Sequence, residues 1–359
     1  MKLYLYNYSF QILGGLFGLI LLCSCTKEDD EESNMGGANI SVVKIYGEGS
    51  KYCAFTSLIK RDNIYYIAFR EGETHGDDGD IGVIKILRSY DGEKWSLVQT
   101  ISLEGVDLRD PDISLKPDGN FLLICGGKKN NGDSNYVIDT YYAKESNGTF
   151  DNPIQIELPT DLSLSPSYSY CWLWRLTWQE GYGYGVAYSK DADNYHADVL
   201  RTTDGIHYTY LSRIDIPKNV SECRIRFTSD GKAIAIIRKD SDNHKGYIGY
   251  SVSPYTEWNW KGLDVIMAGQ DFIIDNEAIM CVSRNIIWGG GYHTNAYFGT
   301  IEGNFDWCCI LPSAGDTGYA GILDEGKEYW ISYYSCHESD KPSIYLAKVP
   351  KMNFYLKKN

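Results

Sequence analysis

The strongest constraint on the fold is a succession of short β-rich runs separated by glycine-containing turns. Between about residues 41 and 351 these runs are rich in Val, Ile, Tyr and Trp, as in "NIYYIAFR", "KAIAIIRK" and "EYWISYY". No stretch of a dozen residues has helical periodicity. Asp-Gly recurs in "RSYDGEKW", "SLKPDGNF", "RTTDGIHY" and "FTSDGKAI", and it supplies the positive backbone angles of tight hairpins. We therefore predict an all-β chain.

The recurrence of the turns favours an array of small sheets over one large sandwich. A body of about 310 residues divides into about six units of about 50 residues, which is the size of a four-stranded propeller blade. We predict a single six-bladed β-propeller over residues 41–355, with four antiparallel strands in each blade.

The N-terminus has the layout of an export signal. Lys2 precedes the apolar run "QILGGLFGLILLCSC", which is too short for a comfortable membrane span. Leu22–Cys25 resembles the lipobox of bacterial lipoproteins, which implies removal of residues 1–24 and a lipid on Cys25. The following "TKEDDEESNMGGAN" makes residues 25–40 a flexible acidic tether, similar to the surface-export signal of Bacteroidota lipoproteins. This resemblance implies a lipid-anchored protein exposed on the outer membrane. The alternative is an uncleaved anchor helix with an acidic linker.

Charge and composition exclude several functions. The chain has 34 basic and 48 acidic side chains, a formal net charge of −14, which argues against a nucleic-acid partner. Apart from the adjacent Cys308 and Cys309, the cysteines are scattered and form no CxxC, so free thiols are favoured over a zinc site. One disulfide is an alternative for an exported protein. No nucleotide, haem or HExxH motif occurs, so no cofactor or metal is predicted. The "GDDGD" run lacks the spacing of an EF-hand calcium loop.

Two turns carry a family resemblance. "SYDGEKW" and "TTDGIHY" resemble the Asp-box of sialidase-like six-bladed propellers, S-x-D-x-G-x-x-W, shortened by one residue. Longer runs, such as "AFTSLIKRDNIYYIAFREG", "LRDPDISLKPDGNFLLICGG" and "LPSAGDTGYAG", resemble bacterial exported proteins described as exo-sialidase-like or BNR-repeat proteins. The similar runs are spread over nearly all of the mature chain. The resemblance implies the propeller fold and a site derived from a glycoside hydrolase.

In sialidases a tyrosine is the nucleophile, a glutamate takes its proton, an aspartic acid is the acid and base, and three arginines bind the substrate carboxylate. A phenol needs such a base to react, and guanidinium groups match carboxylates. The resemblance makes Tyr319 the nucleophile, Glu222 its base and Arg238, 16 residues after Glu222, one of the arginines. Strand alternation alone also allows Glu222, Arg224 and Arg226 to form a surface ladder of paired charges.

The acid and base is expected in the loop that follows Arg70. The run "REGETHGDDGD" offers Asp77, Asp78 and Asp80, with Asp110 in reserve. Crowded carboxylates raise one another's pKa, which suits an acid. A solvated hairpin loop is the alternative.

The arginine pattern departs from that of sialidases. Where the first arginine should precede a strand start, this chain has "CAFTSLI", with Ala54 or Phe55 at that place. The candidate for the third arginine of the triad is Arg284, but the strand register favours His293 at that position. An incomplete triad does not predict sialic acid as the substrate.

Several other residues are candidates for substrate binding. Arg175 lies among tryptophans in "WLWRLTW", where it either contributes to a sugar site or pairs with a buried acid in a Trp-rich core. The remaining candidates are Arg70, His75, Arg109, Asp110 and His337.

Three functions follow as hypotheses. The first is a glycoside hydrolase acting on terminal sugars of host or dietary glycans at the cell surface, with a variant that uses Asp78 and Glu222 as a carboxyl pair. The second is a non-catalytic glycan-binding lipoprotein. The third is a protein-binding propeller.

Overall fold

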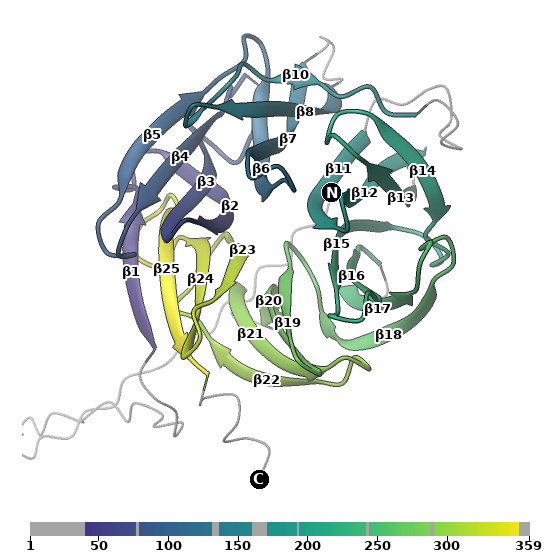
Figure 1. The fold of residues 1–359 in the computed structure, drawn as a ribbon. Coiled ribbons are helices and arrows are strands. Elements are labelled where there is room, and N and C mark those ends of the chain that lie inside the picture. Colours follow the sequence, from purple (N-terminus) through teal and green to yellow (C-terminus); the bar gives the residue numbers. More distant parts are fainter. Residues whose placement is uncertain are drawn as a thin grey trace, which may run out of the picture. The chain divides into compact units, whose positions relative to one another are not determined.

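The structure is a computed structural model that describes residues 40–76, 79–130, 136–159, 171–191, 194–241, 244–287 and 291–351. In this part of the chain 25 β-strands form six sheets. The sheets follow one another around a ring, and one strand of each faces the centre (Figure 1). The predicted six-bladed propeller is confirmed. No helix within the described residues is long and apolar enough to cross a membrane.

The strands run from the centre of the ring outward in sequence order. The first three blades comprise β2 (Tyr52–Arg61), β3 (Ile64–Gly72), β4 (Val83–Ser89) and β5 (Ser96–Ile101); β6 (Asp107–Leu115), β7 (Phe121–Asn130), β8 (Tyr136–Ser146), β9 (Thr149–Phe150) and β10 (Ile154–Gln155); and β11 (Cys171–Gln179), β12 (Tyr182–Asp191), β13 (Asn194–Thr202) and β14 (Tyr208–Arg213). The next two comprise β15 (Val220–Phe227), β16 (Ala233–Lys239), β17 (Lys245–Ser251) and β18 (Asn259–Ile266); and β19 (Asp271–Asp275), β20 (Ala278–Ile287), β21 (Gly291–Thr300) and β22 (Phe305–Ile310).

The sixth blade joins the two ends of the domain. It contains β23 (Thr317–Asp324), β24 (Glu328–Ser335), β25 (Ser343–Pro350) and, as its outer strand, β1 (Ser41–Tyr46). Because β1 pairs antiparallel with β25, the first strand of the chain is hydrogen-bonded to the last. This pairing closes the ring, so that a fixed channel lies at its centre.

The shortened Asp-boxes are turns between the third and fourth strands of two blades. In the first, Asp91 accepts hydrogen bonds from the N–H groups of Glu93 and Lys94, and Gly92 donates to the Ser89 hydroxyl. "TTDGIHY" has the same bonds. Gly92 has φ +72°, and a Cβ there would lie 2.2 Å from Trp330 of the neighbouring blade. The turn therefore needs glycine both for its backbone and for its packing. The other two Asp-Gly turns connect the first and second strands of their blades.

Five of the inner strands contain a β-bulge in their pairing with the second strand of the blade. Their pairing skips two residues, as between Ala54 and Ser57 in β2 and between Gly318 and Gly321 in β23. β6, β11 and β15 show the same shift. Such bulges turn side chains out of the regular alternation. The residues displaced in this way include Phe55, Asp110, Arg175, Glu222 and Tyr319.

Some sequence predictions fall outside the described residues. These are the signal segment, the tether with its lipidated Cys25, the loop residues Asp77 and Asp78, and the end of the predicted domain after residue 351. Seven cysteines are free thiols, in line with the prediction that free thiols are favoured: Cys53, Cys125, Cys171, Cys223, Cys281, Cys309 and Cys336.

Candidate active site

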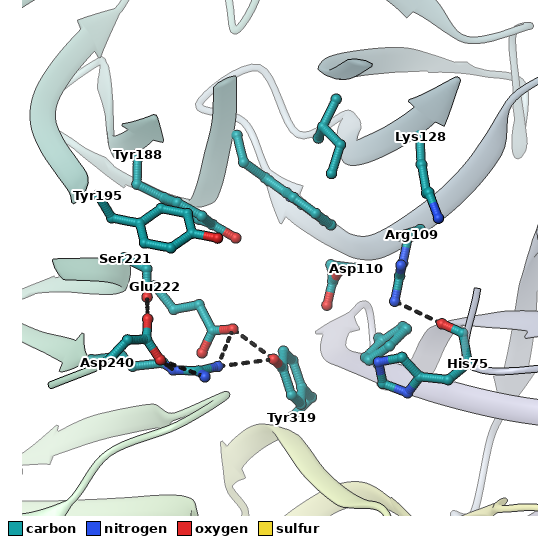
Figure 2. Close-up of a pocket in the computed structure, with 14 residues that line it drawn as sticks. His75, Arg109, Asp110, Lys128, Tyr188, Tyr195, Ser221, Glu222, Asp240 and Tyr319 are labelled. Carbon is teal, nitrogen blue, oxygen red and sulfur yellow. Dashed lines mark hydrogen bonds and ion pairs between the residues drawn. The ribbon is translucent and has the colours of Figure 1, made fainter. Parts of the chain in front are cut away.

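A cavity of about 470 Å³ opens at the centre of the ring, and the inner strands supply half of its lining residues. Figure 2 shows the side chains that face it. It is lined by Phe55, His75, Arg109, Asp110, Lys128, Ile138, Trp172, Tyr188, Tyr195, Ser221, Glu222, Arg238, Asp240 and Tyr319. Five different blades contribute, so the site exists only when the ring is closed.

A tyrosine, a glutamate and an arginine meet at one side of this cavity. The Tyr319 hydroxyl donates to Oε1 of Glu222 at 2.6 Å. Arg238 Nη1 lies 3.0 Å from the same carboxylate oxygen and 3.4 Å from the phenolic oxygen (Figure 2). The other oxygen, Oε2, accepts the N–H of Gly269 at 2.6 Å. The structure thus brings together the three residues that the resemblance paired.

The environment shifts the pKa values of the Tyr319 phenol and the Glu222 carboxylate in opposite directions. Burial by itself favours the neutral form of Glu222. The charge of Arg238 and the hydrogen bonds from Tyr319 and Gly269 more than offset burial, so the pKa of Glu222 lies below its usual value. Burial, reinforced by the Glu222 charge, raises the pKa of Tyr319 well above that of a free phenol. At neutral pH the pair is therefore a neutral phenol held by an ionised base.

Asp110 faces this pair across the cavity (Figure 2). It occupies the bulge of β6 with φ +46°, as Tyr319 occupies that of β23 with φ +50°. Burial raises the pKa of Asp110 to about 7, although the charge of Arg109 acts in the opposite direction. Its Oδ1 is buried and has no hydrogen-bond partner within the described part of the chain. Asp110 is therefore a carboxyl group that holds its proton up to neutral pH beside an open cavity.

Cations and aromatic rings form the rest of the cavity wall. Arg109 Nη2 donates to the carbonyl of His75 at 2.9 Å, and Lys128 Nζ donates to that of Gly76, so both fix the loop that follows β3. On another side the Trp172 and Tyr188 rings are stacked with an interplanar angle of 8°. Aromatic faces of this kind suit the apolar side of a sugar ring.

Arg70 and Asp80 do not line the cavity, contrary to the sequence prediction. Arg70 is fully buried and forms ion pairs with Asp107 at 2.7 Å and Asp80 at 3.0 Å. Asp80 also accepts the N–H groups of Glu73 and Thr74. Burial opposes ionisation, but these hydrogen bonds lower the pKa of Asp80 to about 2. Asp80 therefore holds the loop as a permanent carboxylate and cannot donate a proton at neutral pH.

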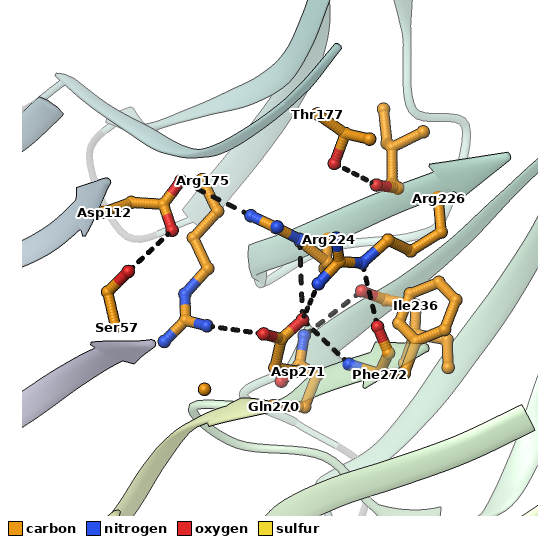
Figure 3. Close-up of polar contacts among 12 residues, drawn as sticks. Ser57, Asp112, Arg175, Thr177, Arg224, Arg226, Ile236, Gln270, Asp271 and Phe272 are labelled. Atoms are coloured by element: carbon orange, nitrogen blue, oxygen red, sulfur yellow. Dashed lines mark hydrogen bonds and ion pairs between the residues drawn. The ribbon is translucent and has the colours of Figure 1, made fainter. Parts of the chain in front are cut away.

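Arg175 belongs to a buried ion network beside the cavity, and it does not line the cavity (Figure 3). Its Nη1 lies 3.0 Å from Asp271. The same aspartate pairs with Arg224 at 3.4 Å and with Arg226 at 3.1 Å, and Arg224 also reaches Asp112 at 3.4 Å. Of the two alternatives predicted for Arg175, the pairing with a buried acid is therefore correct. The network ties three inner strands to the short β19.

Of the three histidines predicted at the site, His75 lines the cavity and the other two lie elsewhere. His293 pairs with Asn285 within the fifth blade, and His337 Nδ1 lies 3.0 Å from the Ser335 hydroxyl; neither lines the cavity. Arg284, rather than His293, is the residue near the nucleophile candidate. Its guanidinium lies over the Tyr319 ring, 5.3 Å from the ring centre.

The sequence reasoning missed several lining residues. Asp240 accepts Arg238 Nε at 2.6 Å and the Ser221 hydroxyl at 2.8 Å. Asp240 could have been predicted as a lining residue, because it follows Arg238 by two residues, directly after the end of β16. Lys128, Tyr188 and Tyr195 could not, because they belong to second and third strands that reach the channel only at their ends.

Comparison with known proteins supports the fold. No protein-family model and no curated protein matches the chain. A structure of unknown function from Dyadobacter fermentans superposes with a TM-score of 0.75 at 16% identity, over 87% of this chain and 99% of the other. Trypanosoma rangeli sialidase bound to the inhibitor DANA superposes with a TM-score of 0.70 at 12% identity, over 90% of this chain. The chain has a sialidase-like propeller fold.

This propeller is shared with more than one kind of glycosidase. The chain spans 61% of the length of the sialidase structure. An α-L-arabinofuranosidase of Fusarium graminearum, solved with an iminosugar inhibitor, superposes with a TM-score of 0.63 at 11% identity, over 87% of this chain and 98% of the other. The sialidase-like propeller is therefore a glycoside-hydrolase-like fold, and the fold alone does not determine a function.

Proposed function

We propose that the protein is a retaining glycoside hydrolase that acts on a terminal sugar through a covalent intermediate on Tyr319. The observation that carries the proposal is the 2.6 Å hydrogen bond from the Tyr319 hydroxyl to Glu222, on the wall of a cavity that also contains a protonated Asp110. Two carboxyl groups whose pKa values are driven apart are the usual arrangement of an acid and a base in one site.

In the first step Glu222 accepts the phenolic proton while the Tyr319 oxygen bonds to the anomeric carbon. The bond from that carbon to the leaving oxygen breaks, and Asp110 donates its proton to the leaving oxygen. In the second step Asp110, now a carboxylate, takes a proton from water as the water oxygen attacks the anomeric carbon. The bond to Tyr319 breaks, and Glu222 returns the proton to the phenolic oxygen.

Arg238 has a supporting role in both steps. It contacts the Glu222 carboxylate and the phenolic oxygen at once, so its charge stabilises the phenolate character that develops on Tyr319. Asp240 fixes the guanidinium from the other side. Because Arg238 is held before substrate binds, little reorganisation is needed when the bond forms.

Release of reducing sugar from a panel of terminally capped glycans tests the proposal. Activity is expected in the wild type and should fall at least about 1,000-fold in Tyr319→Phe and in Glu222→Gln, because each removes a group needed in the transition state. Tyr90→Phe, which removes a hydroxyl from an exposed tyrosine of the Asp-box turn, is the matched control and should retain full activity. Undiminished release by Tyr319→Phe would contradict the proposed nucleophile.

The same experiment separates two choices of acid. Asp110→Asn should lose activity towards substrates with poor leaving groups. Asp77→Asn and Asp78→Asn test the loop residues that were the first choice from the sequence. Loss confined to one of these two variants would move the acid role from Asp110 to the loop.

A second candidate function, glycan binding without catalysis, is favoured by the aromatic wall. Trp172 stacks on Tyr188, whose ring meets that of Tyr195 at 6.2 Å, and all three line the cavity. Binding on a glycan array together with no release of sugar would support this function over hydrolysis.

We also propose that the protein works from the surface of the outer membrane, attached through a lipid on Cys25. The support is the lipobox-like Leu22–Cys25 and the acidic residues that follow it. Fatty-acid labelling of the wild type but not of Cys25→Ser, with the label in the outer-membrane fraction, is the expected result.

A further inference from the structure

We propose that the substrate is an aldoside, a glycoside whose anomeric carbon carries hydrogen rather than a carboxylate, and that Phe55 is the residue that determines this specificity. The inference rests on the hydrolase function proposed above. In that reaction the anomeric carbon must lie against the Tyr319 hydroxyl, so the groups around this oxygen select the substrate.

Phe55 forms the apolar side of the reacting position. It lines the cavity and is 3% exposed, and its ring centre lies 5.1 Å from that of Tyr319 and 5.4 Å from that of His75. It occupies the bulge of β2, the position that corresponds to Asp110 in β6 and to Tyr319 in β23. With φ +62°, Phe55 has a conformation that bulky side chains rarely adopt. Such an outlier at a site indicates a function for the side chain.

The cation nearest to the reacting oxygen is already neutralised. Arg238 lies 3.0 Å from Glu222 and 2.6 Å from Asp240, so two carboxylates share one guanidinium. A third carboxylate, brought in by a substrate, would meet more negative than positive charge on this side of the cavity.

Arg284 is held away from the reacting position. Its Nη1 lies 3.1 Å from Asp316, and it packs over the Tyr319 ring without lining the cavity. Asp316 also accepts hydrogen bonds from Tyr52 and Tyr334 and contacts His75. Burial opposes ionisation, yet the hydrogen bonds with His75 and Tyr52 and the charge of Arg284 lower the pKa of Asp316 to about 2. Asp316 therefore stays ionised and paired with Arg284 at neutral pH. Arg284 is then not available to a substrate.

A carboxylate on the anomeric carbon would thus be buried against Phe55 beside cations that already have partners. Arg109, whose guanidinium lies 5.1 Å from the Phe55 ring centre, donates to the His75 carbonyl and lies 3.9 Å from Asp107. Lys128, the other cation that lines the cavity, donates to the Gly76 carbonyl. Burying a charge in that way is strongly unfavourable. An aldoside instead presents a C–H group to the phenyl ring, which suits an apolar wall.

The test compares 4-methylumbelliferyl aldosides of galactose, glucose, fucose and arabinofuranose, in both anomeric forms, with 4-methylumbelliferyl sialoside. The wild type is expected to cleave at least one aldoside with a kcat/KM at least about 100-fold above that for the sialoside. Equal or faster cleavage of the sialoside would overturn the inference while leaving the hydrolase function intact. Cleavage of no member of the panel would overturn both.

Two variants of Phe55 test whether this residue determines the preference for aldosides over sialosides. Phe55→Arg should narrow the ratio of aldoside to sialoside by at least about tenfold, because it supplies the missing cation. Phe55→Leu keeps an apolar side chain and should keep the preference, although both rates fall. An unchanged ratio in Phe55→Arg would remove Phe55 from the role. Thermal unfolding is measured for both, and if Phe55→Arg does not fold, the wild-type ratio and Phe55→Leu decide.

Discussion

The proton on Asp110 makes the pH profile of kcat/KM a sharp test of the proposed mechanism. Burial raises the pKa of this carboxyl to about 7, and the acid must be protonated for the first step. The protonated fraction falls to about one tenth at pH 8 and about one hundredth at pH 9, so kcat/KM should fall tenfold per pH unit above neutrality. Because the pKa of Glu222 is lowered, the base stays ionised, and the acid limb should lie below pH 4.5, the ordinary value for glutamate.

The size of the effect depends on the leaving group. A methyl or sugar alcohol needs a proton to leave, and general acid assistance contributes about 100- to 10,000-fold. A nitrophenolate leaves without a proton. Asp110→Asn should therefore lose most of its activity on an alkyl glycoside and little on the nitrophenyl glycoside of the same sugar.

The assay is kcat/KM from pH 4 to 9 with both substrates, for the wild type and Asp110→Asn. We expect the basic limb of the alkyl substrate near pH 7 in the wild type and its disappearance in the variant. A basic limb that persists in Asp110→Asn, or equal losses on the two substrates, would refute the assignment of Asp110 as the acid.

Two further predictions concern the scaffold around the site. Asp80→Asn leaves the buried Arg70 with one carboxylate fewer and should lower the free energy of unfolding by about 2–3 kcal/mol in urea denaturation, while the basic limb stays near pH 7; loss of that limb would mean that Asp80 is the acid after all. Gly92→Ala places a Cβ 2.2 Å from Trp330 and should cost about 2–3 kcal/mol, whereas Gly119→Ala, also at positive φ but with nothing within 4 Å, should cost about 1 kcal/mol; equal costs would contradict the packing argument.

The sequence predicted the fold from local features, whereas the pairing of Tyr319 with Glu222, which are 97 residues apart, was predicted from the family resemblance. Asp-Gly turns and β-rich runs define the blades, and the interval between Glu222 and Arg238 follows from one hairpin, since β15 and β16 are adjacent strands. Simple alternation failed at Glu222 itself. The bulge between Val220 and Cys223 sends its side chain to the cavity, while Arg224 enters the buried ion network.

The misplaced residues depend on contacts between blades, which spacing along the chain does not encode. Arg175 looks like a sugar-binding residue from its tryptophan neighbours, but Asp271, 96 residues later, pairs with it. Arg284, rather than His293, lies near Tyr319 because the Arg284 guanidinium of β20 packs across the boundary between blades onto the Tyr319 ring. Asp80 could not be distinguished from a reactive carboxyl without the positions of Arg70 and the loop N–H groups.

Covalent labelling identifies the residue that bonds to the sugar. The protein is incubated with the 2-deoxy-2-fluoro glycosyl fluoride of its best aldoside, and the labelled peptide is identified by mass spectrometry. We expect one added glycosyl group on Tyr319, absent in Tyr319→Phe. A label on Glu222 or Asp110, or continued turnover of aldosides by Tyr319→Phe, would contradict the assignment of Tyr319 as the nucleophile.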